Sequence, residues 1–328
     1  MNTVPTEFVR LNIDRLKDFT RQAFLKVGTR QDDAGLMADL LVQTDLRGVF
    51  SHGTRQIDGY TQMMMEQKVN SKPNIRCSET GPTTAVFDGD GGMGHFPSYQ
   101  AAQFAVQRAK EYGMAGAVTR NHFHFGGAGK YSRMALAEDC IGFATSAHRF
   151  TPGAGQSILS ASGGSPMSFA IPAGQEPPIV IDMGAYIGGS GELSQEQLFQ
   201  NIPAAFFKFI GLGAVAHMLG GFMAGIWMFD SEVNSDTWEG ANQGAFICAI
   251  DISRFRDPDS FKQEVDRHQR NIQRMTPAPG YDQSNLPGTL EYQREQEWAQ
   301  IGIPISPDHQ STLNRVAEKL DLDLLFAS

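Results

Sequence analysis

The hydrophobic positions in the first third of the chain follow a helical spacing. Apolar residues recur at this spacing across residues 16–25 and again across residues 34–41. Asp32 and Asp33 stand just ahead of the second stripe, where negative charge favours the start of a helix. We therefore expect two helices that lead into residues 45–53.

The spacing changes in the middle of the chain, where strand-like and helical runs alternate. Residues 83–87 and 115–119 are strand-like, and a helical stretch at residues 99–112 lies between them, which predicts a βαβ-like unit. Further strand-like runs occupy residues 141–145, 168–172, 178–182 and 246–251. The pattern indicates an α/β or α+β chain.

Helical spacing returns near the end of the chain. Residues 260–275 carry alternating charge, which is typical of an exposed helix. Ser306-Pro307 then opens an amphipathic stretch that reaches Leu320, because Ser is a good N-cap and Pro suits the first helical position.

Composition narrows the class of protein. A chain of 328 residues exceeds the usual size of one domain, so we expect two domains or one large intertwined unit. Its net charge of −9 and the lack of a basic block argue against a nucleic-acid partner. Cys77, Cys140 and Cys248 are far apart and odd in number, and no signal or transit peptide is read at the start, so we expect a cytoplasmic protein.

One segment, residues 202–229, is apolar enough to need a test against a membrane span. It contains Pro203, Lys208, His217 and several glycines, which a buried helix or strand-helix unit tolerates better than a bilayer span does. We therefore expect no membrane insertion.

Residues 89–94 read Gly-Asp-Gly-Gly-Met-Gly, a literal GxGxxG between a strand and a helix. Amide groups at such a helix start can hold a pyrophosphate, as in a Rossmann site, although an ordinary tight turn has the same composition. Arg120-Asn121 stands where the Rossmann pattern has an acidic residue, which favours the turn.

The histidines offer two kinds of chemistry. His122 and His124 are two residues apart, so on a strand they would share a face and could bind a metal together. No third potential ligand lies at a spacing typical of a metal site. We predict no metal site and keep a metal-dependent hydrolase only as an alternative. His52 could exchange a proton with a carbonyl or hydroxyl group near neutral pH, or it could be a structural histidine.

Several short motifs follow one another along nearly the whole chain. Residues 45–53 read Asp-Leu-Arg-Gly-Val-Phe-Ser-His-Gly, and the segment from His124 to Gly129 reads His-Phe-Gly-Gly-Ala-Gly. The other stretches are Gly163-Gly164-Ser165-Pro166, Ile181-Asp182-Met183, Leu286-Pro287-Gly288 and Gly302-Ile303-Pro304. Together they resemble the malate/L-lactate dehydrogenase family, which is distinct from the classical Rossmann enzymes and has a DxRGxxSHG signature and an HFGxAG element.

The resemblance implies an α/β fold with a nucleotide-binding sheet of its own rather than a Rossmann sheet. We expect that sheet domain at residues 76–254 and a helical domain with the SHG motif at residues 1–75 and 255–328. The implied activity is hydride transfer between NAD or NADP and a small 2-oxo or 2-hydroxy acid, in a homodimer. By similarity, the cofactor would contact Asp182, Met183, Gly184, Lys208, Gly288 and Thr289.

That chemistry implies roles for the remaining candidates. Reduction of a ketone develops an alkoxide that must receive a proton, and an imidazolium can give it. We expect His52 in this role, with neighbouring Ser51 as a further catalytic candidate and His124 as a second acid/base or positioning group. A substrate carboxylate favours a guanidinium, which Arg47 or Arg55 can supply, and Tyr60 would cap the substrate or pack beneath it.

The chain also departs from the family pattern. Gln56 stands where the family's substrate arginine is usual, and Arg55 comes one position early. In a strand-like segment, the Arg55 side chain would therefore point away from the substrate position. The connection between Asp182 and Lys208 is short, and residues 205–211 read Ala-Phe-Phe-Lys-Phe-Ile-Gly where relatives carry GGYKGYG. Either the cofactor site is reshaped or the chain is an altered or inactive member that serves as a binding or regulatory protein.

Overall fold

The fold is described from a computed structural model that covers residues 4–161, 164–188, 194–226 and 238–326. The chain divides into two compact units. The first comprises Met1–Asn74, Gly174–Pro178 and Val265–Ser328, and the second comprises Ile75–Ala173 and Ile179–Glu264. Gly163 and residues 227–229 of the apolar segment lie outside the described residues.

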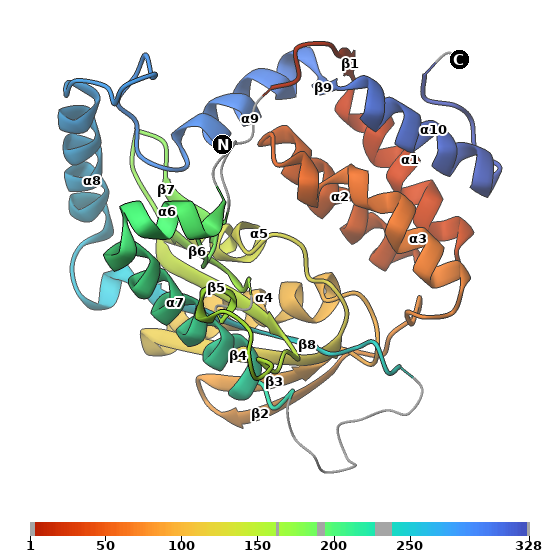
Figure 1. The fold of residues 1–328 in the computed structure, drawn as a ribbon, viewed down its shortest axis with the longest axis horizontal. Helices are drawn as coiled ribbons and strands as arrows, with labels where there is room; N and C mark the ends of the chain where they lie inside the picture. The colour runs from red at the N-terminus through yellow and green to blue at the C-terminus, as the bar shows by residue number, and fades with distance from the viewer. Residues whose placement is uncertain (1–3, 162–163, 189–193, 227–237, 327–328) are drawn as a thin grey trace. The chain divides into compact units, whose positions relative to one another are not determined.

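The first unit is helical, with one small antiparallel sheet. Its helices, labelled in Figure 1, are α1 (Ile13–Lys26), α2 (Gln31–Leu46), α3 (Ile57–Met65), α9 (Thr289–Ile301) and α10 (Pro307–Leu320). Strand β1 (Val9–Leu11) pairs with β9 (Ile303–Ile305). Asn12 caps α1 by accepting two backbone N–H groups, and Ser306 caps α10 as the Ser-Pro pair predicts. The expected helices near residues 16–25 and 34–41 are confirmed as α1 and α2.

A seven-stranded sheet, counted over the described residues, forms the centre of the second unit. Its strand order is β2-β3-β4-β8-β5-β6-β7, and only β3 and β4 run parallel. The strands are β2 (Arg76–Gly81), β3 (Thr84–Asp88), β4 (Met114–His122), β5 (Cys140–His148), β6 (Pro166–Ile171), β7 (Ile179–Gly184) and β8 (Gln243–Asp251). A sheet that is mostly antiparallel is not the parallel sheet of a Rossmann fold, so the expected α/β class with its own sheet is confirmed.

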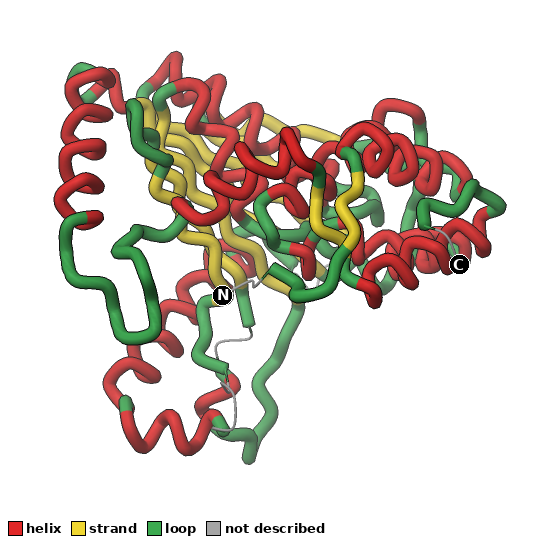
Figure 2. The backbone as a smooth tube through the Cα atoms, turned by 90° about the horizontal axis from the view of Figure 1, so that it is seen from above, coloured by secondary structure: helices red, strands yellow, loops and turns green. Residues whose placement is uncertain are grey.

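Helices cover both faces of this sheet (Figure 2). Helix α4 (His95–Tyr112) connects the parallel strands and confirms the βαβ unit; it packs on one face with the short helix α5 (Gly129–Ser132). Helix α7 (Pro203–His217) packs on the other face, preceded by α6 (Gln195–Asn201). Side chains of β8 alternate accordingly, with Ala245 and Ile247 toward α4 and with Phe246 and Cys248 toward α7.

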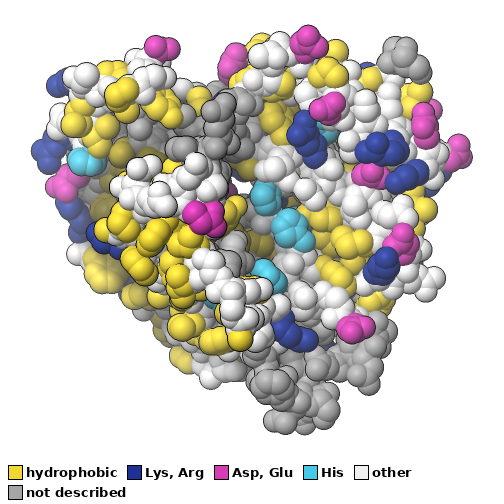
Figure 3. Space-filling view, in the orientation of Figure 1, with side chains coloured by type: hydrophobic (Ala, Val, Ile, Leu, Met, Phe, Trp, Pro, Cys, Tyr) yellow, Lys and Arg dark blue, Asp and Glu magenta, His cyan; other side chains and the backbone are white. Residues whose placement is uncertain are grey.

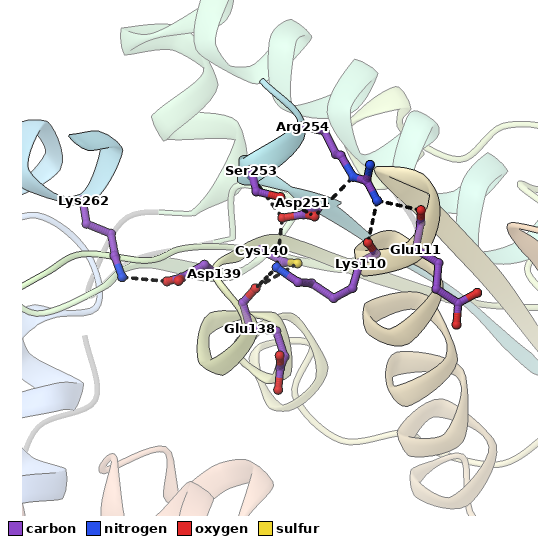
Figure 4. A network of polar contacts seen from close by, with 9 residues as sticks. All are labelled: Lys110, Glu111, Glu138, Asp139, Cys140, Asp251, Ser253, Arg254 and Lys262. Carbon is purple, nitrogen blue, oxygen red and sulfur yellow. Dashed lines mark hydrogen bonds and ion pairs between the residues drawn. The ribbon is translucent and has the colours of Figure 1, made fainter. Parts of the chain in front are cut away.

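A network of polar contacts joins the last turn of α4 to the ends of β8 and β5 (Figure 4). The carboxylate of Asp251, 2% exposed, accepts hydrogen bonds from Lys110 (3.0 Å) and from Ser253. Burial alone would raise the pKa of Asp251, but these hydrogen bonds hold it below its usual value. Arg254 donates to the carbonyls of Lys110 and Glu111, which satisfies acceptors that the helix end leaves unpaired.

Helix α7 is only partly buried, which corrects the expectation of a buried helix. Together with the π-helical turn Met218–Phe222 it exposes a stripe at spacings of three and four residues, and hydrophobic side chains gather over α7 in Figure 3. This α7 stripe comprises Ala204, Phe207, Gly211, Val215, Met218 and Phe222. By length and composition Pro203–Phe222 could cross a membrane, with 28% of its most apolar window buried.

The remaining helix, α8 (Pro258–Gln273), contributes its first residues to the second unit and its later ones to the first. Single 3-10 turns occupy Arg133–Glu138, Ile158–Ser160 and Ile252–Arg254. All three cysteines are free thiols.

Candidate functional site

Ser51, His52 and Gly53 lie on two consecutive 3-10 turns, η1 (Phe50–His52) and η2 (Thr54–Gln56), which connect α2 to α3. The hydroxyl oxygen of Ser51 is 2.9 Å from Nδ1 of His52. The imidazole is half-buried, and the Ser51 side chain is exposed. The Ser51 hydroxyl therefore engages the Nδ1 side of the ring.

The carboxylate of Asp45 lies directly beneath this loop. Asp45 is fully buried at the end of α2, and its Oδ2 accepts the backbone N–H of Thr54 at 3.0 Å and the Thr54 hydroxyl. A Cβ atom at Gly53 would stand 1.8 Å from Oδ1 of Asp45. The signature therefore has glycine after the histidine because backbone and carboxylate approach each other here.

Arg47 holds the same loop from the other side. Its guanidinium makes a two-fold hydrogen bond to Glu295 of α9, at 2.8 and 3.0 Å, with the side chain 14% exposed. Gly48 has φ +77° and faces Arg294, whose Nη1 would be 2.5 Å from an added Cβ. The guanidinium proposed for the substrate carboxylate is thus engaged by a carboxylate of the protein itself.

The other predicted substrate contacts also have structural partners. Residues 54–56 form a 3-10 turn rather than a strand, so the strand-like expectation is wrong; exposed Arg55 donates to the hydroxyl of Ser306 at 2.8 Å. Gln56 donates to the carbonyl of Ser51 at 2.7 Å, which helps to fix the loop. Tyr60 is 2% exposed, and burial raises the pKa of its hydroxyl. It therefore packs within the first unit.

His122 is a structural residue of the second unit. A carbonyl can only accept, so Nδ1 of His122 donates to the carbonyl of Phe123 at 2.7 Å, and Nε2 accepts from the Thr119 hydroxyl at 2.8 Å. Burial lowers the pKa of His122 to about 4. Both ring nitrogens are thus used within the protein, which leaves this ring without a lone pair for a metal.

His124 does not share a strand with His122, so the expectation that they face the same side of one strand is wrong. Asn121 has φ +55°, the pairing register shifts between Thr119 and His122, and β4 ends at His122. His124 is half-buried in the segment that follows. Among the described residues, no three His, Cys, Asp or Glu side chains gather as a metal site would require.

The GxGxxG segment forms a tight turn. The amide of Gly89 donates to the carbonyl of Arg120 at 2.8 Å, that of Gly91 to Asn121 at 2.9 Å, and that of Gly94 to His124 at 3.1 Å. Because these N–H groups already bond to the end of β4 and to His124 just after it, they do not form a phosphate cradle. The turn instead fixes the backbone that carries His124.

In the second unit, Asp182, Met183 and Gly184 form the end of β7. Here the buried hydroxyl of Ser165, 1% exposed, has no hydrogen-bond partner in the described part of the chain. The Ser165 carbonyl accepts the N–H of Ala185 at 2.8 Å, so this serine lies beside the β7 end. An unsatisfied buried hydroxyl fits a ligand that supplies a hydrogen bond, such as the ribose of a nicotinamide nucleotide.

Two phenylalanines of the 205–211 segment, Phe206 and Phe207, differ in exposure on α7. Phe206 is 1% exposed and packs edge-on against Phe199 of α6, with ring centroids 5.7 Å apart. Phe207 is 58% exposed. Lys208 is exposed, and within the described residues no carboxylate pairs with its ammonium group. A cation available in this way fits the phosphate groups of a dinucleotide.

The last two cofactor candidates begin α9 in the first unit. Gly288 precedes the helix with φ +99°, a conformation that favours glycine. Thr289 is 2% exposed, and its N–H donates to the carbonyl of Leu286 at 3.3 Å. The candidates are therefore divided: His52, Ser51, Gly288 and Thr289 belong to the first unit, and His124, Asp182 and Lys208 belong to the second.

Comparison with known proteins covers nearly the whole chain. The family model described as malate/L-lactate dehydrogenase matches residues 11–198 and 193–314. A malate dehydrogenase of Pyrococcus horikoshii is 27% identical over 354 positions, with 98% of each chain covered, and an L-sulfolactate dehydrogenase of Methanocaldococcus jannaschii is 28% identical over 98% of this chain and 97% of the relative. The solved structure of the Pyrococcus horikoshii malate dehydrogenase superposes with a TM-score of 0.84 over 98% of this chain and 99% of that chain.

Proposed function

The chain belongs to the malate/L-lactate dehydrogenase family, and from this premise we propose that it is an oxidoreductase that moves a hydride between a nicotinamide cofactor and a small 2-oxo or 2-hydroxy acid. The observation that carries the proposal is the Ser51–His52 pair, hydrogen-bonded at 2.9 Å on a loop that a buried carboxylate holds. Relatives named for malate, sulfolactate and lactate share this class of substrate.

In the proposed mechanism the imidazole of His52 is the acid/base group. In the reducing direction, the protonated ring gives a proton to the oxygen of the substrate as negative charge develops there; in the oxidising direction, the neutral ring removes it. Ser51 fixes the ring orientation through Nδ1. His124, half-buried after the glycine turn, is the second group proposed to contact the substrate.

The nicotinamide cofactor, NAD or NADP, supplies or accepts the hydride when it is bound. Asp182, Met183 and Gly184 with the Ser165 hydroxyl, the ammonium of Lys208, and Gly288-Thr289 are the groups proposed to hold it. Arg55 is the better candidate for the substrate carboxylate because its guanidinium bonds to a neutral serine, whereas that of Arg47 bonds to Glu295.

A steady-state assay of the purified protein with NADH and NADPH across a panel of 2-oxo acids tests the proposal. Loss of an acid/base group costs about 100- to 10,000-fold in turnover, so His52→Ala should be at least about 100-fold slower. His268→Ala, at an exposed position of α8, is the matched control. Wild-type turnover by His52→Ala would exclude His52 as the acid/base group.

The second candidate function is a family member that binds a ligand without turnover. It is supported by Phe206 and Phe209, which stand where the family pattern has glycine. Titration calorimetry with NADH and NADPH separates the two functions, because nucleotide binding with no turnover on any 2-oxo acid favours the binding protein. Turnover of any panel member excludes it.

We also propose that the chain forms a homodimer through the α7 stripe. Phe207, Val215, Met218 and Phe222 are 50–58% exposed, which amounts to about 400 Å² of apolar surface, roughly half of what each partner contributes to a standard interface. The exposed Lys208 lies at the edge of this face, beside Phe207, and the stripe itself is uncharged. A second copy with the same apolar surface would cover its apolar part while the ammonium of Lys208 stays at the rim, in water.

Sedimentation of the double variant Val215→Glu/Met218→Glu tests this interface. The proposal predicts a dimer for the wild type, a monomer for this variant, and a dimer for the control Met275→Glu, whose residue is 63% exposed in the first unit. An unchanged dimer in the double variant contradicts it. A wild-type monomer that co-sediments with phosphatidylcholine–phosphatidylglycerol vesicles would instead identify the stripe as a membrane-binding surface.

A further inference from the structure

A buried polar chain connects the loop of His52 to the first turn of α10. Asp45 and Thr54 are fully buried, and His309 is 1% exposed. The hydroxyl oxygen of Thr54 contacts Oδ2 of Asp45 and lies 2.9 Å from Nε2 of His309, which is 255 residues away in sequence. All three residues belong to the first unit.

The chemistry of these groups fixes the direction of the hydrogen bonds. A carboxylate only accepts, so the single hydroxyl proton of Thr54 goes to Asp45. The hydroxyl oxygen of Thr54 must then accept from His309, whose Nε2 therefore carries the ring proton. Burial lowers the pKa of His309 to about 3, so the ring stays a neutral donor at ordinary pH.

His309 contacts the loop on both sides of His52. Before His52, the imidazole of His309 packs edge-on against Phe50, with centroids 6.1 Å apart and planes at 71°. Phe50 in turn stacks on Trp298, at 6.0 Å and 16°. After His52, His309 bonds to Thr54. The two contacts therefore hold the chain two residues before and two residues after His52.

We propose that His309 is a positioning residue for the reaction, acting through Thr54 and Asp45 to hold the imidazole of His52 at the place where it exchanges its proton. This role rests on the proposed function. A displacement of about 1 Å in a reacting group can cost about 100-fold in rate, so a contact remote from the chemistry can control turnover.

Two substitutions at His309 separate the effect of its hydrogen bond to Thr54 from the effect of side-chain packing. His309→Leu keeps apolar volume but removes the donor, and His309→Gln retains an N–H at about the reach of Nε2. We expect kcat to fall about 100-fold in His309→Leu with the KM for the nicotinamide cofactor unchanged, and His309→Gln to recover to within about 3-fold of the wild type. His268→Leu, at an exposed site, serves as the control.

The second readout is the NMR signal of the His52 imidazole, followed through a pH titration in the protein without substrate. The proposal predicts that His309→Leu shifts the signal and that His309→Gln restores it. An unmoved signal, or a kcat of His309→Leu equal to that of the wild type, overturns it. If His309→Leu does not fold, His309→Asn, a polar side chain too short to reach Thr54, replaces it in both measurements.

The two readouts separate this proposal from the proposed function. A wild type that turns over no 2-oxo acid contradicts the proposed function, while the titration of His52 still decides whether His309 positions the ring.

Discussion

Gly53→Ala should destabilise the first unit, because the loop approaches Asp45 too closely for any side chain at this position. The added Cβ would lie 1.8 Å from Oδ1 and 2.5 Å from Cγ of Asp45. Gly53 has φ −100°, so the penalty is steric and not one of backbone conformation. Overpacking costs about 1–3 kcal/mol, and weakening a hydrogen bond to the buried carboxylate adds about 1.5 kcal/mol or more, so we expect a loss of about 3 kcal/mol or more.

Urea unfolding of Gly53→Ala against Gly59→Ala measures this effect. Gly59 lies on α3 with nothing within 4 Å of an added Cβ, so its replacement should stabilise the protein by up to about 1 kcal/mol through helix propensity. Displacement of the loop should also lower turnover in Gly53→Ala alone. Equal unfolding midpoints for the two variants would refute the argument that the signature glycine is required by the close approach of Asp45.

Three further outcomes are expected. His122 is buried with its pKa lowered from 6.5 to about 4, so the unfolded state binds more protons between these values. The contribution of His122 to the free energy of unfolding, measured by urea titration, should fall by about 3 kcal/mol as the pH falls through this window. The slope should therefore be shallower by that amount in His122→Gln, and the part due to buried His309, whose pKa is lowered to about 3, should remain. Lys110→Met removes the 3.0 Å contact to buried Asp251 and should lower stability by about 1–3 kcal/mol in a thermal melt; an unchanged melting temperature would contradict the role of this contact. A double-mutant cycle of Arg47→Lys and Glu295→Gln should give a coupling of about 1–2 kcal/mol, whereas additive effects would mean that the pair does not support the loop.

The elements that could be predicted from sequence are those whose hydrophobic period is regular. The strands at residues 84–88 and 114–122 and the helix between them could be predicted because β3 is buried at alternate positions and β4 is buried at most of its positions. Strand β2 was missed because all but one of its residues are exposed, which leaves no alternation to detect. The burial of α7 was overestimated because an apolar composition does not say whether a partner covers every face.

The candidate site, too, could be predicted only in part from the sequence. The signature loop and its histidine could be identified from contiguous residues, but the groups that hold the loop could not. Glu295 is 248 residues from Arg47, and His309 is 255 residues from Thr54, so no local pattern links them. The expectation that His122 and His124 share a face was wrong because the left-handed conformation of Asn121, next to the end of the strand, has no signal in the spacing.

The pH dependence of kcat/KM for reduction of a 2-oxo acid, in the wild type and in His52→Gln, tests the central claim most directly. Proton donation by the imidazolium predicts that the wild-type rate falls with a single titration as the pH rises through the range where histidine loses its proton, and that His52→Gln is slow with no such titration. A variant that keeps both the wild-type rate and the wild-type titration would show that another group supplies the proton.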